Sequence, residues 1–296
     1  MCLTAQCITI FIKNNTSMKL NKVHKIIVKK LWNKYNFNWD NLNSDVNILI
    51  GINGSGKTTL FNIIDAVLTA DVKKLKAYNV EVELSIDDKV IRYNPKMKVT
   101  ELATQLLGIN YKKISTFDVP NNSKKRTNKG YSQLYNELHT LVYEIGSPDT
   151  SFSDYRLKAT NFPEQAEKIN KRIQAFYSTV DHLFYKTEKV IQIDPMTNHM
   201  IFIDNGEVIP LYKLSSGEKQ LMLILLKVFL MEEEPYILLM DEPEISLHID
   251  WQYKLFQEIQ KLNPNCQIIT STHSPSLFGD GWGDKLFYVE ELVSLC

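Results

Sequence analysis

The chain has 296 residues, of which 44% are hydrophobic and 23% are charged, a balance that excludes an intrinsically disordered protein. Its 34 basic and 34 acidic residues cancel, so nucleic-acid binding by the whole surface is not expected, although a local basic groove remains open. No apolar run reaches the roughly 18 residues that span a bilayer. The cysteines, Cys2, Cys7, Cys266 and Cys296, lack a metal-binding spacing, and the N-terminus lacks the features of a signal peptide. We therefore expect a cytoplasmic protein without a membrane segment.

The first part of the chain has the hydrophobic patterns of short strands and one helix. Strands are predicted at residues 24–31, 46–50, 80–86, 90–93 and 114–117, the third and fourth as a hairpin. Residues 57–68 carry apolar side chains at helical spacing. The run at 46–50 ends at Gly51, as expected of a buried strand that leads into a loop.

The middle of the chain differs, because residues 131–184 have a mostly helical pattern with one interruption near 146–148. Strands are then predicted at 190–193, 200–203, 208–211, 236–240, 267–271 and 285–289, with helices at 219–230 and 246–262. This alternation predicts an α/β fold with a mixed, mostly parallel sheet. We expect three parts: residues 1–118 as the first half of the sheet domain, 119–189 as an inserted helical lobe, and 190–296 as the second half.

A glycine-rich segment between the predicted strand 46–50 and helix 57–68 matches the phosphate-binding pattern GxxxxGK[ST]. Its glycines let successive main-chain N–H groups face a β-phosphate at the positive end of the helix dipole. Lys57 would bridge the β- and γ-phosphates, the Thr58 hydroxyl would bind Mg²⁺, and Thr59 could reach the α-phosphate. The predicted nucleotide-binding residues here are Asn53, Gly54, Ser55, Gly56, Lys57, Thr58 and Thr59. The segment therefore predicts a P-loop that binds ATP with Mg²⁺.

A second chemical element is the apolar strand at 236–240, which runs into Asp241 and Glu242. Open α/β sheets bind their ligands at such carboxyl ends of parallel strands. Asp241 would hold the Mg²⁺ shell, usually through water, and Glu242 would orient or deprotonate the attacking water. Alone, the pattern is also that of an ordinary exposed strand end.

A third element, LSSGEKQ at residues 214–220, precedes Asp241 by 21 residues and opens an apolar helix. With it, the sequence resembles the ABC-type ATPases, whose signature loop lies at about this distance before the acidic strand. The form LSSGEKQ is more typical of the soluble SMC, Rad50 and OLD-like branch than of transporters. The resemblance implies a second anion site made by Ser215, Ser216, Gly217 and Glu218. The alternative is an ordinary helix N-cap with Glu218 in a partial capping box.

The resemblance extends to other positions. His273, after the strand at 267–271, matches the switch histidine that contacts the γ-phosphate and positions the water, although a histidine there is often structural. His248 departs from the family's D-loop pattern and is expected at an interface or a helix N-terminus. The family's usual glutamine near residues 114–118 is missing, and Asp118 alone is available for the metal. The adenine-stacking aromatic is unassigned between Trp32, Tyr35 and Phe37, each of which could instead belong to the core.

One phosphate loop and one signature imply a particular assembly. In ABC-type ATPases the signature of one protomer faces the phosphate loop of the other, so two ATP molecules lie within a head-to-tail pair. By resemblance, the hydrolytic form is therefore expected to be a homodimer or a higher oligomer, with ATP as part of the interface.

The resemblance leaves three possible outputs for the ATPase. A transporter subunit is disfavoured because LSSGEKQ and DEPEISLH differ from the transporter patterns LSGGQ and DEPTSALD. A Rad50- or SMC-type DNA-repair or DNA-binding machine is disfavoured because no sustained heptads predict coiled-coil arms. The string DEPEISLHIDW at 241–251, with residues 267–275, most resembles the compact ATPases of bacterial anti-phage defence systems such as Septu, retron and PARIS systems.

Relatives in that group carry or recruit a nuclease or another toxic effector. Because 21 residues follow Pro275, too few for such a domain, we expect a separate effector protein with this chain as its sensor or scaffold. The basic segment that contains Lys124, Lys125, Arg126 and Lys129 could contact a trigger, either nucleic acid or an acidic phage protein. The alternative is a solvated loop.

Overall fold

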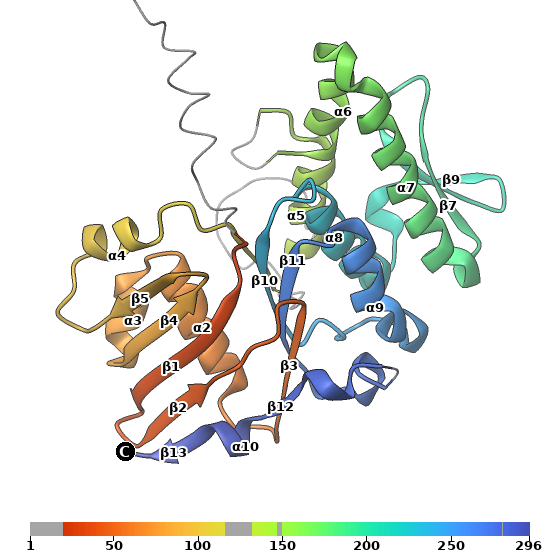
Figure 1. Ribbon diagram of the computed structural model, residues 1–296. Helices are drawn as coiled ribbons and strands as arrows, with labels where there is room; N and C mark the ends of the chain where they lie inside the picture. Colours follow the sequence, from red (N-terminus) through yellow and green to blue (C-terminus); the bar gives the residue numbers. More distant parts are fainter. Residues whose placement is uncertain (1–19, 116–131, 147–149, 280) are drawn as a thin grey trace, which may run out of the picture.

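A five-stranded, all-parallel sheet forms the centre of the fold in a computed structural model that describes residues 20–115, 132–146, 150–279 and 281–296 (Figure 1). Its strands, in spatial order, are β12 (Leu286–Tyr288), β3 (Val46–Ile50), β11 (Cys266–Ser271), β10 (Tyr236–Asp241) and β6 (Tyr111–Ser115). The inner strands are buried along almost their whole length, which is why they read as continuous apolar runs.

The parallel sheet separates two apolar cores. Ile48, Leu238, Met240 and Ile268 belong to one core, and Leu49, Ile237, Leu239 and Ile269 belong to the other. Successive residues of these strands therefore point to opposite faces, as strand geometry requires.

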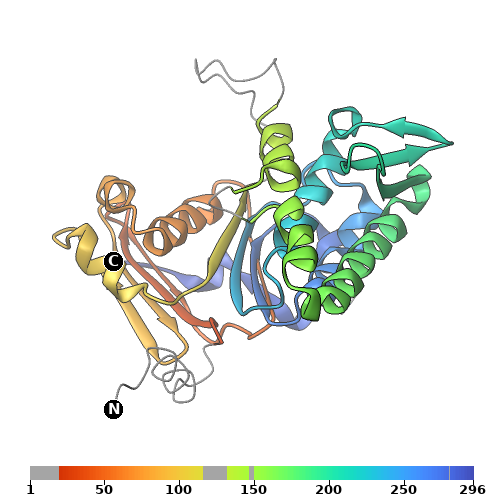
Figure 2. The ribbon, with the colours of Figure 1, turned by 90° about the horizontal axis from the view of Figure 1, so that it is seen from above.

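An antiparallel sheet and three helices make up the second core (Figure 2). The strands, in spatial order, are β13 (Val293–Leu295), β2 (Tyr35–Trp39), β1 (Val23–Leu31), β4 (Glu81–Ile86) and β5 (Lys89–Tyr93). The helices are α2 (Lys57–Leu68), α3 (Val72–Tyr78) and α4 (Val99–Gln105). The last strand of the chain thus pairs with one of the first.

The first core is mostly helical. Its helices are α5 (Gln133–Tyr143), α6 (Phe152–Asn161), α7 (Ala166–Phe184), α8 (Ser216–Phe229) and α9 (Ile249–Leu262). A small antiparallel sheet of β7 (Lys189–Ile193), β8 (Met200–Asp204) and β9 (Glu207–Ile209) joins α7 to α8, and α10 (Val289–Leu292) lies between β12 and β13. Short 3₁₀ turns occur at Pro163–Gln165, Tyr185–Thr187, Leu211–Lys213, Pro275–Leu277 and Gly283–Lys285.

Charged contacts tie α8 to the helices before it. Lys227 of α8 pairs with Glu137 of α5, and Arg172 of α7 pairs with Glu233 and donates to the Phe229 carbonyl at 2.7 Å. Since α5, α6 and α7 also share one apolar cluster with α8, they form a continuous unit with it. The division of the chain at residues 118 and 189 remains a prediction.

The α/β class, the parallel sheet and the predicted strand and helix patterns are confirmed, with shifts at several ends. The helix predicted from residue 246 begins at Ile249, because Ser246 has a φ of 69° that no right-handed helix accepts. The strand predicted at 208–211 ends at Ile209, because Pro210 has no N–H for the ladder. Strands β2 and β13 and the short helices α3, α4 and α10 were not predicted from the sequence.

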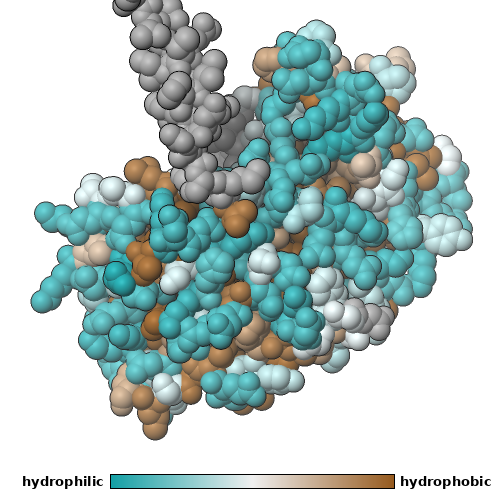
Figure 3. Space-filling view, viewed as in Figure 1, coloured by the Kyte–Doolittle hydropathy of each residue, from teal (hydrophilic) through white to brown (hydrophobic). Residues whose placement is uncertain are grey.

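In the described ranges, every helix is too short or too polar to cross a bilayer. The face seen in Figure 1 is covered mostly by hydrophilic side chains, with hydrophobic ones in scattered groups (Figure 3).

Candidate functional site

The phosphate-binding segment forms the turn between β3 and α2. Gly54 and Gly56 have φ values of 81° and 98°, in the left-handed region that glycine adopts without strain. A Cβ at Gly56 would lie 3.0 Å from Cη2 of Trp32, so a larger residue there would push the tryptophan ring aside. Gly56 is the N-cap of α2 and offers no side-chain cap to the helix. The first N–H groups of α2 are therefore left without a side-chain acceptor.

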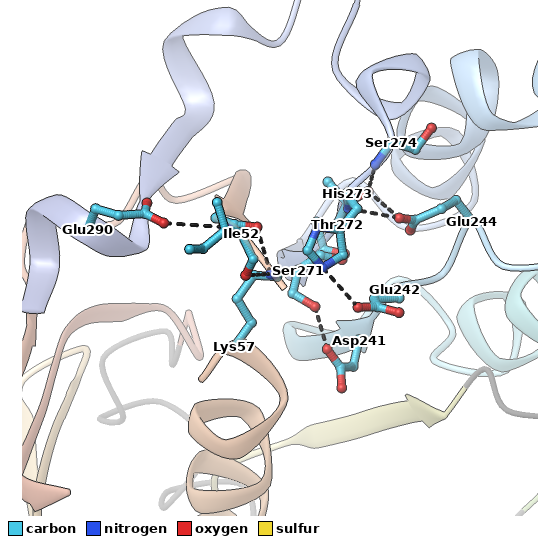
Figure 4. A network of polar contacts seen from close by, with 12 residues as sticks. Ile52, Lys57, Asp241, Glu242, Glu244, Ser271, Thr272, His273, Ser274 and Glu290 are labelled. Carbon is cyan, nitrogen blue, oxygen red and sulfur yellow. Dashed lines mark hydrogen bonds and ion pairs between the residues drawn. The ribbon is translucent and has the colours of Figure 1, made fainter. Parts of the chain in front are cut away.

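Lys57 is buried, with 4% of its surface exposed, and its ammonium is held inside the loop. Nζ donates to the carbonyl oxygens of Gly51 at 2.8 Å and Ile52 at 3.2 Å (Figure 4). Burial lowers the pKa of this ammonium from its ordinary value, while the charges of Glu242 and Asp241 oppose that shift. The lysine is thus a desolvated cation, which attracts an anionic ligand more strongly than a solvated one does, while the two neighbouring carboxylates oppose that attraction.

Asp241 and Glu242 lie at the carboxyl end of β10, next to the end of β11. Asp241 pairs in register with Ser271, whose hydroxyl donates to Oδ1 of Asp241. Glu242 turns away with a φ of 51°, and its N–H donates to the Ser271 carbonyl at 3.0 Å. Its Oε1 lies 3.3 Å from Nε2 of His273 (Figure 4). The predicted acid and the predicted switch histidine are therefore within contact distance.

A cavity of about 270 Å³ brings most of these groups together. Its walls come from Trp32, Asn53, Gly54, Gly56, Lys57, Thr58, Thr59, Glu242 and His273. Asp241 and Ser55 do not line it. The Ser55 hydroxyl is buried and finds no partner among the described residues.

A magnesium ion fits the donor set beside this cavity. The Thr58 hydroxyl, on an exposed residue, and the Asp241 carboxylate are hard oxygen donors of the kind that Mg²⁺ prefers. In the described ranges no three His, Cys, Asp or Glu side chains cluster as a metal site. Mg²⁺ does not need such a cage, because it keeps several waters and takes further ligands from phosphate.

An apolar cavity of about 210 Å³ adjoins the same loop. It is lined by Leu31, Trp32, Tyr35, Phe37, Gly54, Ser55, Gly56, Lys57, Leu60, Val289 and Val293. Of the three aromatic candidates, Phe37 is buried in the core, Tyr35 is half-buried, and Trp32 is 51% exposed. Of these three aromatic residues, Trp32 alone lines both cavities, and its stacking on a base stays a prediction.

The signature segment begins α8 through a complete capping box. The Ser215 hydroxyl accepts from the Glu218 N–H at 3.2 Å, and Glu218 Oε2 accepts from the Ser215 N–H at 2.8 Å. Lys189 donates to the other oxygen of Glu218 at 2.8 Å. Burial disfavours the charged form, but these donors and the Lys189 charge hold the pKa of Glu218 below its ordinary value. The capping alternative is thus present in the structure, and it occupies both carboxylate oxygens of Glu218.

Gly217 lies where α8 meets the loop after Glu242. A Cβ at this position would lie 2.3 Å from the Ser246 carbonyl oxygen, so the approach excludes any other residue. His248, in the same loop, caps α9 by accepting from the Asp250 N–H at 3.3 Å. It is a helix-N-terminal residue, one of the two roles expected for it.

A third cavity, of about 670 Å³, surrounds this signature segment. It is lined by Ser215, Ser216, Gly217 and Glu218, by Ser246, Leu247 and His248, and by His182, Leu183, Tyr185, Lys186, Thr187, Asp250, Trp251 and Lys254. As far as the structure describes the chain, it shares no lining residue with either cavity at the phosphate loop. The two predicted phosphate-binding elements therefore open into separate spaces.

Three residues of the site were missed by sequence reasoning. They are Ser271, which holds Asp241, Glu244, which contacts the His273 main chain, and Glu290, whose Oε1 accepts from the Ile52 N–H at 3.2 Å. Only Glu244 had a local signal, as the acid after Asp241-Glu242-Pro243. Asp118 and the basic segment with Lys124, Lys125, Arg126 and Lys129 lie outside the described residues.

Comparison with known proteins gives a family and a partial relative. Residues 74–278, more than half of the chain, match the family described as "AAA ATPase domain". The matched segment contains the signature, Asp241, Glu242 and His273, and the phosphate loop precedes it. The chain is 31% identical over 141 residues to "Retron Vc95 probable ATPase" of Vibrio cholerae serotype O1 biovar El Tor. That match covers 43% of this chain and about a quarter (26%) of the relative.

Solved structures share the fold. The SMC head domain from Thermotoga maritima matches with a TM-score of 0.54 and 16% identity, over 90% of this chain and 94% of that one. An SMC head solved with the C-winged helix domain of ScpA matches with a TM-score of 0.52 and 16% identity, over 87% and 92%. At this identity the likeness concerns the fold.

Proposed function

This chain belongs to the AAA ATPase domain family and is an ATPase, and on that premise we propose that it hydrolyses Mg-ATP between two of its own copies. We further propose that the pair controls a separate effector protein, a nuclease or toxin, in anti-phage defence. The observation that carries the first proposal is the separation of the signature cavity from the phosphate-loop cavity. A signature that opens into a different cavity from its own phosphate loop would act on the nucleotide of a second copy.

Within one copy, the residues of the phosphate-loop cavity have distinct roles. Main-chain N–H groups from Asn53 to Thr59 bind the phosphates at the N-terminus of α2, and Thr58 with Asp241 holds Mg²⁺. The ion supplies charge neutralisation on the β- and γ-phosphates. The adenine stacks on Trp32, whose ring is exposed beside the loop.

Lys57 must change partners when nucleotide binds. Its ammonium now donates to two carbonyl oxygens of the loop, and phosphate oxygens offer stronger, charge-assisted acceptors. Glu242 orients or deprotonates the attacking water, and His273, 3.3 Å from it, contacts the γ-phosphate side of that water.

The second copy completes the site from the opposite side. Ser215, Ser216 and the Gly217 N–H present the remaining donors of the signature to the partner's γ-phosphate. Glu218 has no free oxygen for that task, so its part is to hold the start of α8 in place. Two such sites then form at one symmetric interface.

The proposed role in anti-phage defence is supported by the partial similarity to the retron ATPase. A nucleic acid or a phage protein would act as the trigger, and a separate effector would respond to the closed pair. A DNA-repair role like that of Rad50 or SMC proteins is the less favoured alternative. The longest helix of the described ranges is α7, with 19 residues, which is far from the arms of such machines.

Mixing two inactive variants tests the shared site. Lys57→Met removes the phosphate-loop cation, and Ser216→Arg fills the signature cavity from an exposed position. A heterodimer of the two keeps one intact site, made by the loop of one copy and the signature of the other. We expect an equal mixture to recover about a quarter of the wild-type ATPase rate, if dimers form at random.

The matched control is a chain that carries both substitutions, mixed with each single variant. In either mixture, no dimer places an intact phosphate loop opposite an intact signature. Both mixtures should therefore stay inactive. Recovery in the control, or no recovery in the test mixture, would contradict a site shared between copies.

A further inference from the structure

Glu244 is a buried carboxylate to which the mechanism above gives no role. It lies three residues after Asp241, and 9% of its surface is exposed. Its Oε1 accepts from the Thr272 hydroxyl and, at 3.0 Å, from the main-chain N–H of His273 (Figure 4). Its Oε2 is buried and has no partner among the described residues. A buried carboxylate with an unpaired oxygen is costly, so its presence requires an explanation.

The side chain of Glu244 is one member of a closed ring of hydrogen bonds. Thr272 Oγ1 also accepts from the Ser274 N–H at 2.9 Å, and Ser274 Oγ donates to Gln252 Oε1 at 2.7 Å. Gln252 Nε2 donates to the Leu247 carbonyl at 2.9 Å, and the Leu247 N–H donates to the Glu244 carbonyl at 2.9 Å. The ring therefore joins the loop after β10, the start of α9 and the loop after β11.

The two ends of this ring face different cavities. Leu247 lines the signature cavity, and His273 lines the phosphate-loop cavity. Glu244 is the residue that holds both, through its carbonyl toward Leu247 and through its carboxylate toward His273. The ring therefore gives a continuous hydrogen-bonded connection between residues 244–247 and the main chain that carries the His273 imidazole.

We propose that Glu244 is a positioning residue that aligns His273 with Glu242 and couples this alignment to the loop at the signature cavity. The proposal rests on the proposed function, because that loop would meet the second copy in the ATP-bound pair. The carboxylate fixes the His273 main chain, and the imidazole is thereby kept 3.3 Å from the acid that handles the attacking water.

Steady-state kinetics of full-length variants test this role. Glu244→Ala removes the acceptor, and we expect kcat to fall about 100-fold, the effect of a small displacement of a catalytic group. KM for ATP should stay within about twofold, because Glu244 does not line the phosphate-loop cavity. Glu244→Gln keeps one acceptor oxygen and should restore kcat to within about threefold of wild type.

Glu258→Ala is the matched control, since Glu258 is also a buried carboxylate, 3% exposed, on α9 and paired with Lys261. It should lower the unfolding midpoint as much as Glu244→Ala does while leaving kcat unchanged. Thr272→Val, a substitution of similar shape, should give a smaller loss of kcat than Glu244→Ala because the His273 bond remains. A kcat within about threefold of wild type in Glu244→Ala, or an equal loss in Glu244→Gln, would overturn the proposal.

Hydrogen exchange at the His273 amide, without nucleotide, separates this proposal from the proposed function. In Glu244→Ala we expect that amide to exchange at least about tenfold faster, with protection retained in Glu244→Gln. Unchanged exchange would refute the positioning role even if ATP-dependent pairing is found. Faster exchange together with failure of the mixing test would sustain the role of Glu244 and refute the shared site.

Discussion

The phosphate loop and the signature loop both precede a helix, but only the helix after the signature loop has a side-chain N-cap. Helix α2 begins at a glycine without a side-chain cap and has no acidic residue in its first turn. Helix α8 begins at Ser215 with a full capping box, and Glu218 is held there by Lys189. An uncapped start leaves all of its first N–H groups for an anion, whereas the capped start of α8 gives the Glu218 N–H to the Ser215 hydroxyl.

This difference assigns unequal tasks to the two cavities. In the proposed function, the phosphate loop binds nucleotide by itself, and Lys57, which is buried and donates to the Gly51 carbonyl, supplies the cation. The signature loop is a rigid surface whose shape depends on Gly217 and the Ser246 carbonyl. In the proposed function, it contributes to hydrolysis once another copy brings a nucleotide to it.

The largest expected effect comes from removing the cation of the uncapped helix. Lys57→Met should lower kcat/KM for ATP by about 100- to 1,000-fold, the usual cost of losing one preorganised stabilising group at a reacting phosphate. Steady-state ATPase assays measure it, with Lys73→Met, at an exposed position of α3, as the control. Equal rates in both variants would mean that the uncapped helix does not bind the nucleotide.

Gly217→Ala tests the close contact between the signature loop and the Ser246 carbonyl. The added Cβ would lie 2.3 Å from the Ser246 carbonyl oxygen, so α8 and the loop must separate at a cost of about 1–3 kcal/mol. We expect hydrolysis to fall by about tenfold or more while nucleotide binding to single copies is unchanged. Gly283→Ala, where an added Cβ meets nothing, is the control. A parallel loss of nucleotide affinity would contradict the separation of tasks.

Trp32→Ala should have a smaller effect on the phosphate-loop side. Stacking of a base on an aromatic ring contributes about 1–3 kcal/mol, so KM for ATP should rise about tenfold with kcat unchanged. Trp32→Phe should recover most of the affinity. If KM stays at the wild-type value in Trp32→Ala, the adenine lies elsewhere.

The smallest effect concerns the pH dependence of stability at the capped helix. The pKa of Glu218 is held below its ordinary value, so its contribution is present at neutral pH and is lost as pH falls below about 4. Glu218→Gln should lower the free energy of unfolding by about 1–2 kcal/mol at pH 7, and the difference should shrink toward pH 3. Urea titrations at both pH values measure it, and the exposed Glu207→Gln should show no such change.

Local sequence patterns were sufficient to predict the strand and the helix on either side of the phosphate loop. The strand at 46–50 and the helix at 57–68 occur as predicted, because a buried apolar run and an amphipathic spacing are both local signals. Strand β2, at Tyr35–Trp39, was not predicted from the sequence. Its pairing with β1 and with the distant β13 is a tertiary feature that no short window contains.

Contacts between residues of the candidate site also depend on tertiary structure that a short stretch of sequence does not contain. The order of Lys57, Asp241, Glu242 and His273 along the chain indicated that they would meet, since each follows a strand of a parallel sheet. The contact of Glu244 with His273, 29 residues later, depends on the path of two loops. Of the two roles predicted for Glu218, the structure shows the capping role, with Lys189 on the other carboxylate oxygen. Its part in an anion site stays a prediction.

The central claim, that ATP joins two copies through the phosphate loop of one and the signature of the other, is tested most directly by molar mass. Glu242→Gln should retain ATP without hydrolysing it, so its mass in solution can be measured with and without Mg-ATP. The account predicts a single copy without nucleotide and a dimer or larger assembly with it. A variant that binds Mg-ATP and stays monomeric at every concentration tested would contradict the shared site.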